Sequence, residues 1–176
     1  MLTISGALRA VDDFFQPAPV GPAVALHTPV QFDRALIRRL LSDHEALNAR
    51  FAHLVCLIDT DLAAAIDAAG DCINRIHELR RSESTWLYPV IACGIDADPA
   101  ARTQLMQLRL VMLTLARHAM RELEDLVRAV REHDQPHAAA ERASAPLAEY
   151  LRRSASEIYP LYDLMGARNA PAVRAA

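Results

Sequence analysis

Apolar residues recur at intervals of three and four along most of the chain, the spacing that places them on one face of an α-helix. The first apolar stripe runs from residue 37 to 58 and includes His44, and the second runs from 62 to 90 and includes Glu83. A third covers about 99 to 132, and a fourth runs from about 147 to 165. Four amphipathic helices of this length predict an all-α domain.

Helix start and stop signals separate these stripes. Thr28-Pro29-Val30-Gln31 combines a Thr N-cap, a Pro at the first helical position and a Gln at the capping-box position, so we expect the first helix to begin there. Asp59-Thr60-Asp61 offers a cap for the second helix, and Asp98-Pro99 begins the third. Pro89 marks the last turn or a kink of the second helix. Short loops make neighbouring helices antiparallel, which predicts an up-and-down four-helix bundle.

We expect the bundle to occupy residues 29–166. Residues 1–28 form an N-terminal arm, in which residues 1–15 have the pattern of a short amphipathic helix and the Pro-rich remainder is an irregular connector. Three placements are open for the arm: against the bundle, exchanged between two protomers, or on a partner. Residues 167–176 are expected to be a frayed tail.

Composition narrows the class of protein further. The chain is 52% hydrophobic but only 5% aromatic, a balance that favours helices, and its net charge of −3 argues against nucleic acid and anionic membranes as partners. It lacks both the basic start of a signal peptide and the roughly 18 uninterrupted apolar residues of a membrane span. Cys56, Cys72 and Cys93 form no C-x-x-C pair. We therefore expect a soluble, cytoplasmic protein without disulfides.

Catalytic motifs are missing from the sequence. It contains no P-loop, no G-x-G-x-x-G, no H-E-x-x-H and no recognisable nucleophile motif. The expectation is that the protein is not an enzyme.

Two short motifs carry a family resemblance. Ser42-Asp43-His44-Glu45 lies early in the first predicted helix, and Glu83-Ser84-Thr85-Trp86-Leu87-Tyr88-Pro89 lies near the end of the second. Together they resemble the hemerythrin-like (HHE cation-binding) domain family, whose members carry a D-H pair and an H-x-x-x-E-x-x-x-L-[FY]-P segment. The resemblance covers residues 31 to about 165. It implies a four-helix bundle in which histidines and carboxylates from all four helices hold two irons.

The chain departs from the family's ligand pattern. His44 and Glu83 match the first histidine and the bridging carboxylate, but Leu79 stands where a second histidine is expected. In the fourth helix Tyr150 and Ser154 replace a histidine and a carboxylate. We therefore expect no cofactor, and a relic polar network of His44, Glu83, Tyr150 and Ser154 in which a His44–Glu83 hydrogen bond satisfies both groups.

The alternative is a hemerythrin-like sensor or carrier of oxygen or iron. Its iron would be bound by His44 and Glu83, with His77 and His118 as further ligands. His77 is two positions from the expected histidine, a rotation of roughly 200° around the helix, and His118 lies beside the third apolar stripe.

A helical scaffold without metal chemistry favours a binding role. We expect a regulatory module that binds a protein partner, for example a transcription or signalling factor, and a homodimer is compatible with this role. Four aromatic residues gather near the Pro-bearing ends of the second and fourth helices. They predict a hydrophobic plug or, if exposed, a partner surface: Trp86, Tyr88, Tyr159 and Tyr162.

Overall fold

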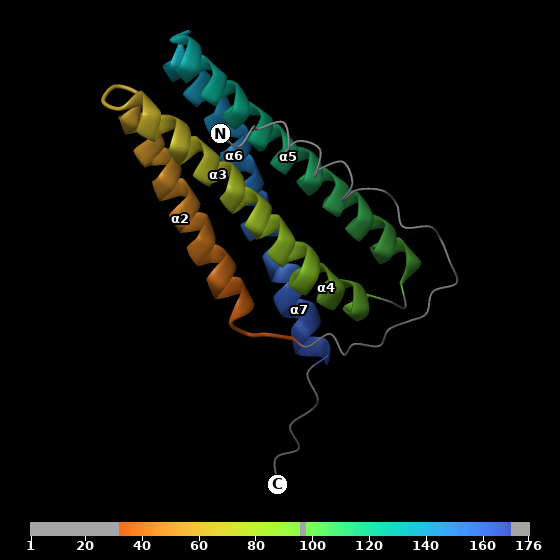
Figure 1. The fold of residues 1–176 in the computed structure, drawn as a ribbon. Helices are drawn as coiled ribbons and strands as arrows, with labels where there is room; N and C mark the ends of the chain where they lie inside the picture. Colours follow the sequence, from red (N-terminus) through yellow and green to blue (C-terminus); the bar gives the residue numbers. More distant parts are fainter. Residues whose placement is uncertain (1–31, 96–97, 170–176) are drawn as a thin grey trace, which may run out of the picture.

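A computed structural model describes residues 32–95 and 98–169, with side chains through residue 166 (Figure 1). This part of the chain is all-helical and without strands, and its arrangement is compatible with a four-helix bundle. The helices are α2 (Leu36–Leu57), α3 (Leu62–Ser82), α4 (Tyr88–Gly94), α5 (Pro99–Glu132), α6 (Pro136–Arg153) and α7 (Tyr159–Asn169). The π-helical turns η2 (Glu83–Leu87) and η3 (Ser154–Ile158) join α3 to α4 and α6 to α7.

Four helical rods therefore lie side by side, two of them made of a pair of helices joined by a π turn (Figure 1). The helix α3 packs between α2 and α5, while α6 packs against α5 and, over a shorter stretch, against α2. At one end of the molecule α4 packs against α7. The hydrophobic core runs along the space that these rods enclose.

The core follows the spacing predicted from the sequence. Buried residues of α2 recur at three, four and seven, and they include His44. Leu41 lies within the range of the first predicted stripe but is 39% exposed, because it is one position past the buried Leu40. In the first half of α3 the buried residues are small, which lets neighbouring helices approach closely: Ala65, Ala68, Ala69 and Cys72.

Two of the predicted helix starts are confirmed. Asp61 caps α3 by accepting a hydrogen bond from the Ala64 N–H at 3.0 Å. Asp98 Oδ1 accepts from the N–H groups of Ala100 and Ala101 at 2.9 and 3.2 Å, and α5 spans Pro99–Glu132 as expected.

The predicted start of the first helix is wrong. The signal itself, residues 28–31, lies outside the described residues, but residues 32–35 are not helical and α2 begins at Leu36. The backbone N–H of Asp33 donates to the Tyr162 hydroxyl of α7 at 2.9 Å, and the Asp33 side chain accepts from the Ala35 N–H at 2.8 Å. These contacts hold residue 33 outside the helix.

Each of the two π turns lies just before a proline, η2 before Pro89 and η3 before Pro160. Pro89 and Pro160 lack the N–H that an α-helix would bond to the carbonyl four residues earlier. Just before each proline the hydrogen-bonding pattern widens, so that the N–H of Tyr88 donates to the Glu83 carbonyl and that of Tyr159 to the Ser154 carbonyl. The kink expected at Pro89 is therefore a π turn, with a matching turn in the other composite rod.

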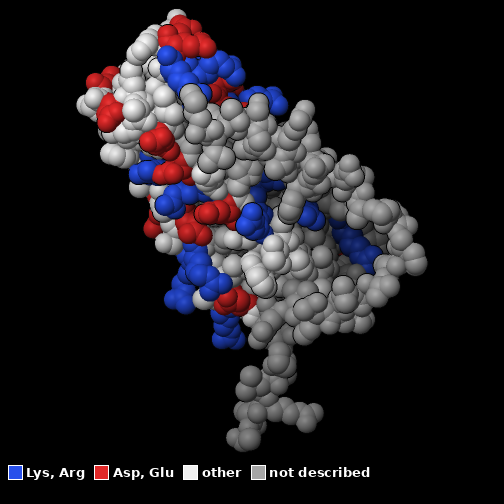
Figure 2. All heavy atoms as spheres, in the orientation of Figure 1, with Lys and Arg blue, Asp and Glu red and all other residues white. Residues whose placement is uncertain are grey.

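The surface visible in Figure 2 carries acidic and basic side chains interspersed over the side where α2 and α3 lie. No helix among the described residues is long and apolar enough to cross a membrane. The arm predicted for residues 1–28 lies outside the described residues. The tail was predicted to begin at residue 167, but α7 continues through Asn169, and residues 170–176 lie outside the described residues.

Candidate functional site

Polar side chains gather in the middle of the bundle, where the two π turns meet α2. Glu83 begins η2 and is 2% exposed, and His44 of α2 is 6% exposed. Tyr150 of α6, Ser154 of η3 and Tyr159 of α7 are buried with them. We call these five residues the central cluster.

Hydrogen bonds join four members of the central cluster. The Tyr150 hydroxyl donates to Glu83 Oε2 at 3.0 Å. The Tyr159 hydroxyl lies 3.2 Å from Glu83 Oε1 and 2.7 Å from His44 Nε2, so it bridges the two groups. We expected a direct bond between His44 and Glu83, and the structure places Tyr159 between them instead.

Two hydroxyls at the site have no hydrogen-bond partner. The Ser154 hydroxyl is fully buried without a bond of good geometry, although it is close enough to Glu83 to favour the carboxylate. The Tyr88 hydroxyl is also buried and unpartnered, while the guanidinium of Arg109 lies 5.3 Å from the centroid of the Tyr88 ring. Burying these two hydroxyls lowers the stability of the fold, since an unsatisfied buried hydroxyl loses its bonds to water.

Burial favours the uncharged form of every titratable group in the central cluster. Desolvation raises the pKa of Glu83, opposed by the hydrogen bonds from Tyr150 and Tyr159 and by the nearby Ser154 hydroxyl. Desolvation lowers the pKa of His44 to about 4. The pKa values of both cluster tyrosines rise for the same reason.

The Tyr159 hydroxyl has one proton, which it can donate either to His44 or to Glu83, so the protonation state of Glu83 determines the direction of both hydrogen bonds. When Glu83 is protonated, its O–H donates to Tyr159, and the Tyr159 O–H donates to His44 Nε2. When Glu83 is ionised, Tyr159 donates to Glu83, and the Nε2–H of His44 donates to Tyr159. Both arrangements satisfy all three groups, and the raised pKa of Glu83 favours the first.

The metal set expected under the iron alternative is not brought together. His77 is half-buried on α3, whereas His118 is exposed on α5 and lies 3.3 Å from Glu122. Within the described ranges no three His, Cys, Asp or Glu side chains are grouped to hold a metal ion. The remaining donors at the centre are hydroxyls whose raised pKa values oppose the phenolate form. A di-iron centre, which needs about five or more nitrogen and oxygen ligands, does not fit these residues.

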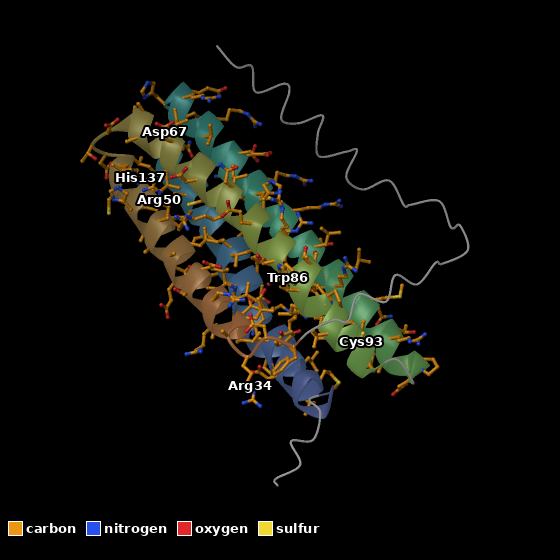
Figure 3. The ribbon with its side chains drawn as sticks, turned by 60° about the horizontal axis from the view of Figure 1, so that its bottom comes forward. Arg34, Arg50, Asp67, Trp86, Cys93 and His137 are labelled. Carbon is orange, nitrogen blue, oxygen red and sulfur yellow. The ribbon has the colours of Figure 1, made fainter. Side chains whose placement is uncertain are left out.

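The aromatic partner surface is also corrected. Tyr88, Tyr159 and Tyr162 are 6%, 2% and 0% exposed, so they form part of the interior. Trp86 alone reaches the surface, at 62% exposure, from the π turn η2 (Figure 3). The aromatic residues near the two prolines therefore behave mainly as the hydrophobic plug.

Sequence patterns did not predict the second feature of the molecule, an apolar groove beside α4 and the beginning of α5. Leu105 and Leu108, within the third apolar stripe, are partly buried and pack against the core, but no residue from 98 to 111 is fully buried. Met106 and Leu110 are 72% and 63% exposed. The groove measures about 310 Å³ and is lined by Ser84, Tyr88, Pro89, Ala92, Arg102, Leu105, Met106 and Arg109. We call it the α4–α5 groove.

The chain matches no protein-family model, no curated protein and no solved structure. Its class is therefore defined by what the structure contains: an all-helical protein with a buried central cluster and an apolar surface groove.

Proposed function

We propose that this protein is a non-enzymatic helical module that binds an amphipathic helix of a partner protein in the α4–α5 groove. The observation that carries the proposal is the exposure of Met106 and Leu110, at 72% and 63%, beside a groove with apolar walls. Large apolar side chains grouped on a surface mark protein interaction sites. An apolar groove between helices suits a helix that presents side chains at three- and four-residue spacing.

The lining of the groove gives the expected chemistry of the partner. Tyr88, Pro89 and Leu105 supply apolar contact area, and Met106 can adjust its conformation to different side chains. Arg102 and Arg109 lie in the same lining, so acidic residues flanking the apolar face of the partner are favoured.

The central cluster supports a structural role for the middle of the bundle. Its partnered groups bond to one another, and burial favours their uncharged forms. We infer that it is a relic of a hemerythrin-like metal site in an up-and-down bundle.

Short connections through residues 58–61 and 133–135, each between helices packed against one another, support the up-and-down order of the helices. A regulatory role in the cytoplasm is part of the same proposal.

A substitution in the lining of the groove tests whether the groove binds a partner. Met106→Asp is expected to abolish capture of the partner from an extract of the native cell while changing stability by less than about 0.5 kcal/mol, because the side chain is exposed. Leu164→Asp on α7 is the matched control, since Leu164 is 48% exposed and does not line the groove. The captured protein must contain an amphipathic segment whose synthetic peptide binds with the same dependence on Met106. Equal binding by both variants would contradict the proposal.

A further inference from the structure

We propose that residues 1–15 of this chain occupy the α4–α5 groove as an amphipathic helix, so that the protein carries its own competitor for the partner. This inference rests on the proposed function, because it takes the groove to be a site for a helix. It identifies an intramolecular occupant and, with it, a way to regulate binding.

The described chain begins close to the groove. Phe32 packs on Tyr162 with 5.0 Å between ring centroids, and a Cβ added to Gly166 would meet the Phe32 ring, so Phe32 lies directly on α7. Since α7 packs against α4, which lines the groove, the described chain starts on the neighbouring helix (Figure 1).

The connector is long enough for this placement. Residues 16–31, fully extended, span at most roughly 50 Å at about 3.3 Å per residue. A helix of the length of α5 also extends about 50 Å. The connector can therefore reach from Phe32 to the groove without being fully extended. A tethered segment that begins beside its binding site has an effective concentration in the millimolar range.

The sequence of the arm suits the groove. In a helix four of its aliphatic and aromatic side chains form one stripe at spacings of four and three, while Ser5, Arg9 and Asp12 fall on another face. Asp12 and Asp13 lie next to the stripe's aromatic end, and a groove containing Arg102 and Arg109 favours them. The stripe consists of Ile4, Leu8, Val11 and Phe15.

Hydrogen exchange of the full-length protein tests the inference. The amides of residues 2–15 are expected to exchange about tenfold or more slowly than those of a synthetic peptide of residues 1–15. Met106→Asp in the groove and Leu8→Asp in the stripe should each return them to the peptide's rate. Leu164→Asp, at an exposed position outside the groove, and Ser5→Asp, off the proposed stripe, should leave the protection in place.

Three outcomes would overturn the inference: peptide-like exchange in the unmodified protein, protection that survives Met106→Asp, and protection that is lost on dilution. Loss on dilution would assign the groove to the arm of a second copy. If the arm exchanges freely while the partner still depends on Met106, the inference fails and the proposed function stands. If the arm is protected and no partner binding depends on Met106, the proposed function fails. If the arm is protected and partner binding also depends on Met106, Leu8→Asp must tighten partner binding.

Discussion

Replacing Tyr159 by phenylalanine is expected to lower the free energy of unfolding by about 2–4 kcal/mol at neutral pH, although the substitution removes one oxygen atom. That oxygen lies 2.7 Å from His44 Nε2 and 3.2 Å from Glu83 Oε1. Its loss leaves two buried polar groups each short of a hydrogen bond, and an unsatisfied buried group costs about 1–3 kcal/mol.

Tyr150→Phe provides the comparison within the same cluster. Tyr150 makes a single hydrogen bond, to Glu83 Oε2 at 3.0 Å, so the expected loss is about 1–2 kcal/mol. Urea unfolding of both variants measures the difference. Equal losses, or a loss below about 0.5 kcal/mol for Tyr159→Phe, would show that Tyr159 does not bridge His44 and Glu83.

Acid should destabilise the fold through His44. Its pKa in the folded protein is about 4, below its ordinary value of 6.5. Between these values the unfolded chain binds a proton that the folded protein excludes. The contribution of neutral His44 is therefore complete above pH 6.5 and falls as the pH decreases toward 4. The shift corresponds to a loss of about 3 kcal/mol.

The variant His44→Gln isolates this effect. Glutamine retains an amide that can bond to Tyr159 but does not titrate, so the stability difference between the two proteins should change by about 3 kcal/mol from pH 7 to pH 4. Glu83 acts with the opposite sign, because its raised pKa gives stability that is present at low pH and lost as the pH rises through the folded value. Glu83 is present in both proteins, and a pH-independent difference would therefore count against a buried, neutral His44.

The sequence predicted correctly those features that depend on a single helix, namely which face is buried and where a capping residue begins the helix. His44 and Glu83 were placed inward because they occupy apolar stripes, and both are buried. The caps at Asp61 and Asp98 depend only on local bonding, and α5 has its predicted bounds. The first helix begins later than expected because Asp33 bonds to Tyr162, 129 positions along the chain, and such a contact has no local signal.

The remaining features depend on how the helices meet. Tyr159 was assigned to an aromatic plug, whereas the turn η3 and the packing of α7 bring its hydroxyl between His44 and Glu83. A signal for this position was present, since the segments 83–89 and 154–160 both end in Tyr-Pro. Met106 and Leu110 are exposed because they lie on a different face of α5 from the buried Leu123 and Leu126. The groove itself had no such signal, because its lining comes from both α4 and α5 and depends on how these helices lie in the fold.

Unfolding in the presence of metal tests the central claim most directly, namely that His44, Glu83, Tyr150 and Tyr159 bond to one another and leave no ligand set. A metal that binds only the folded protein stabilises it by about 2.7 kcal/mol at 100 times its dissociation constant. With Fe(II), Mn(II) or Zn(II), we predict the same change in unfolding free energy for the unmodified protein and for Glu83→Gln. A stabilisation of about 2 kcal/mol or more that Glu83→Gln abolishes would contradict the claim.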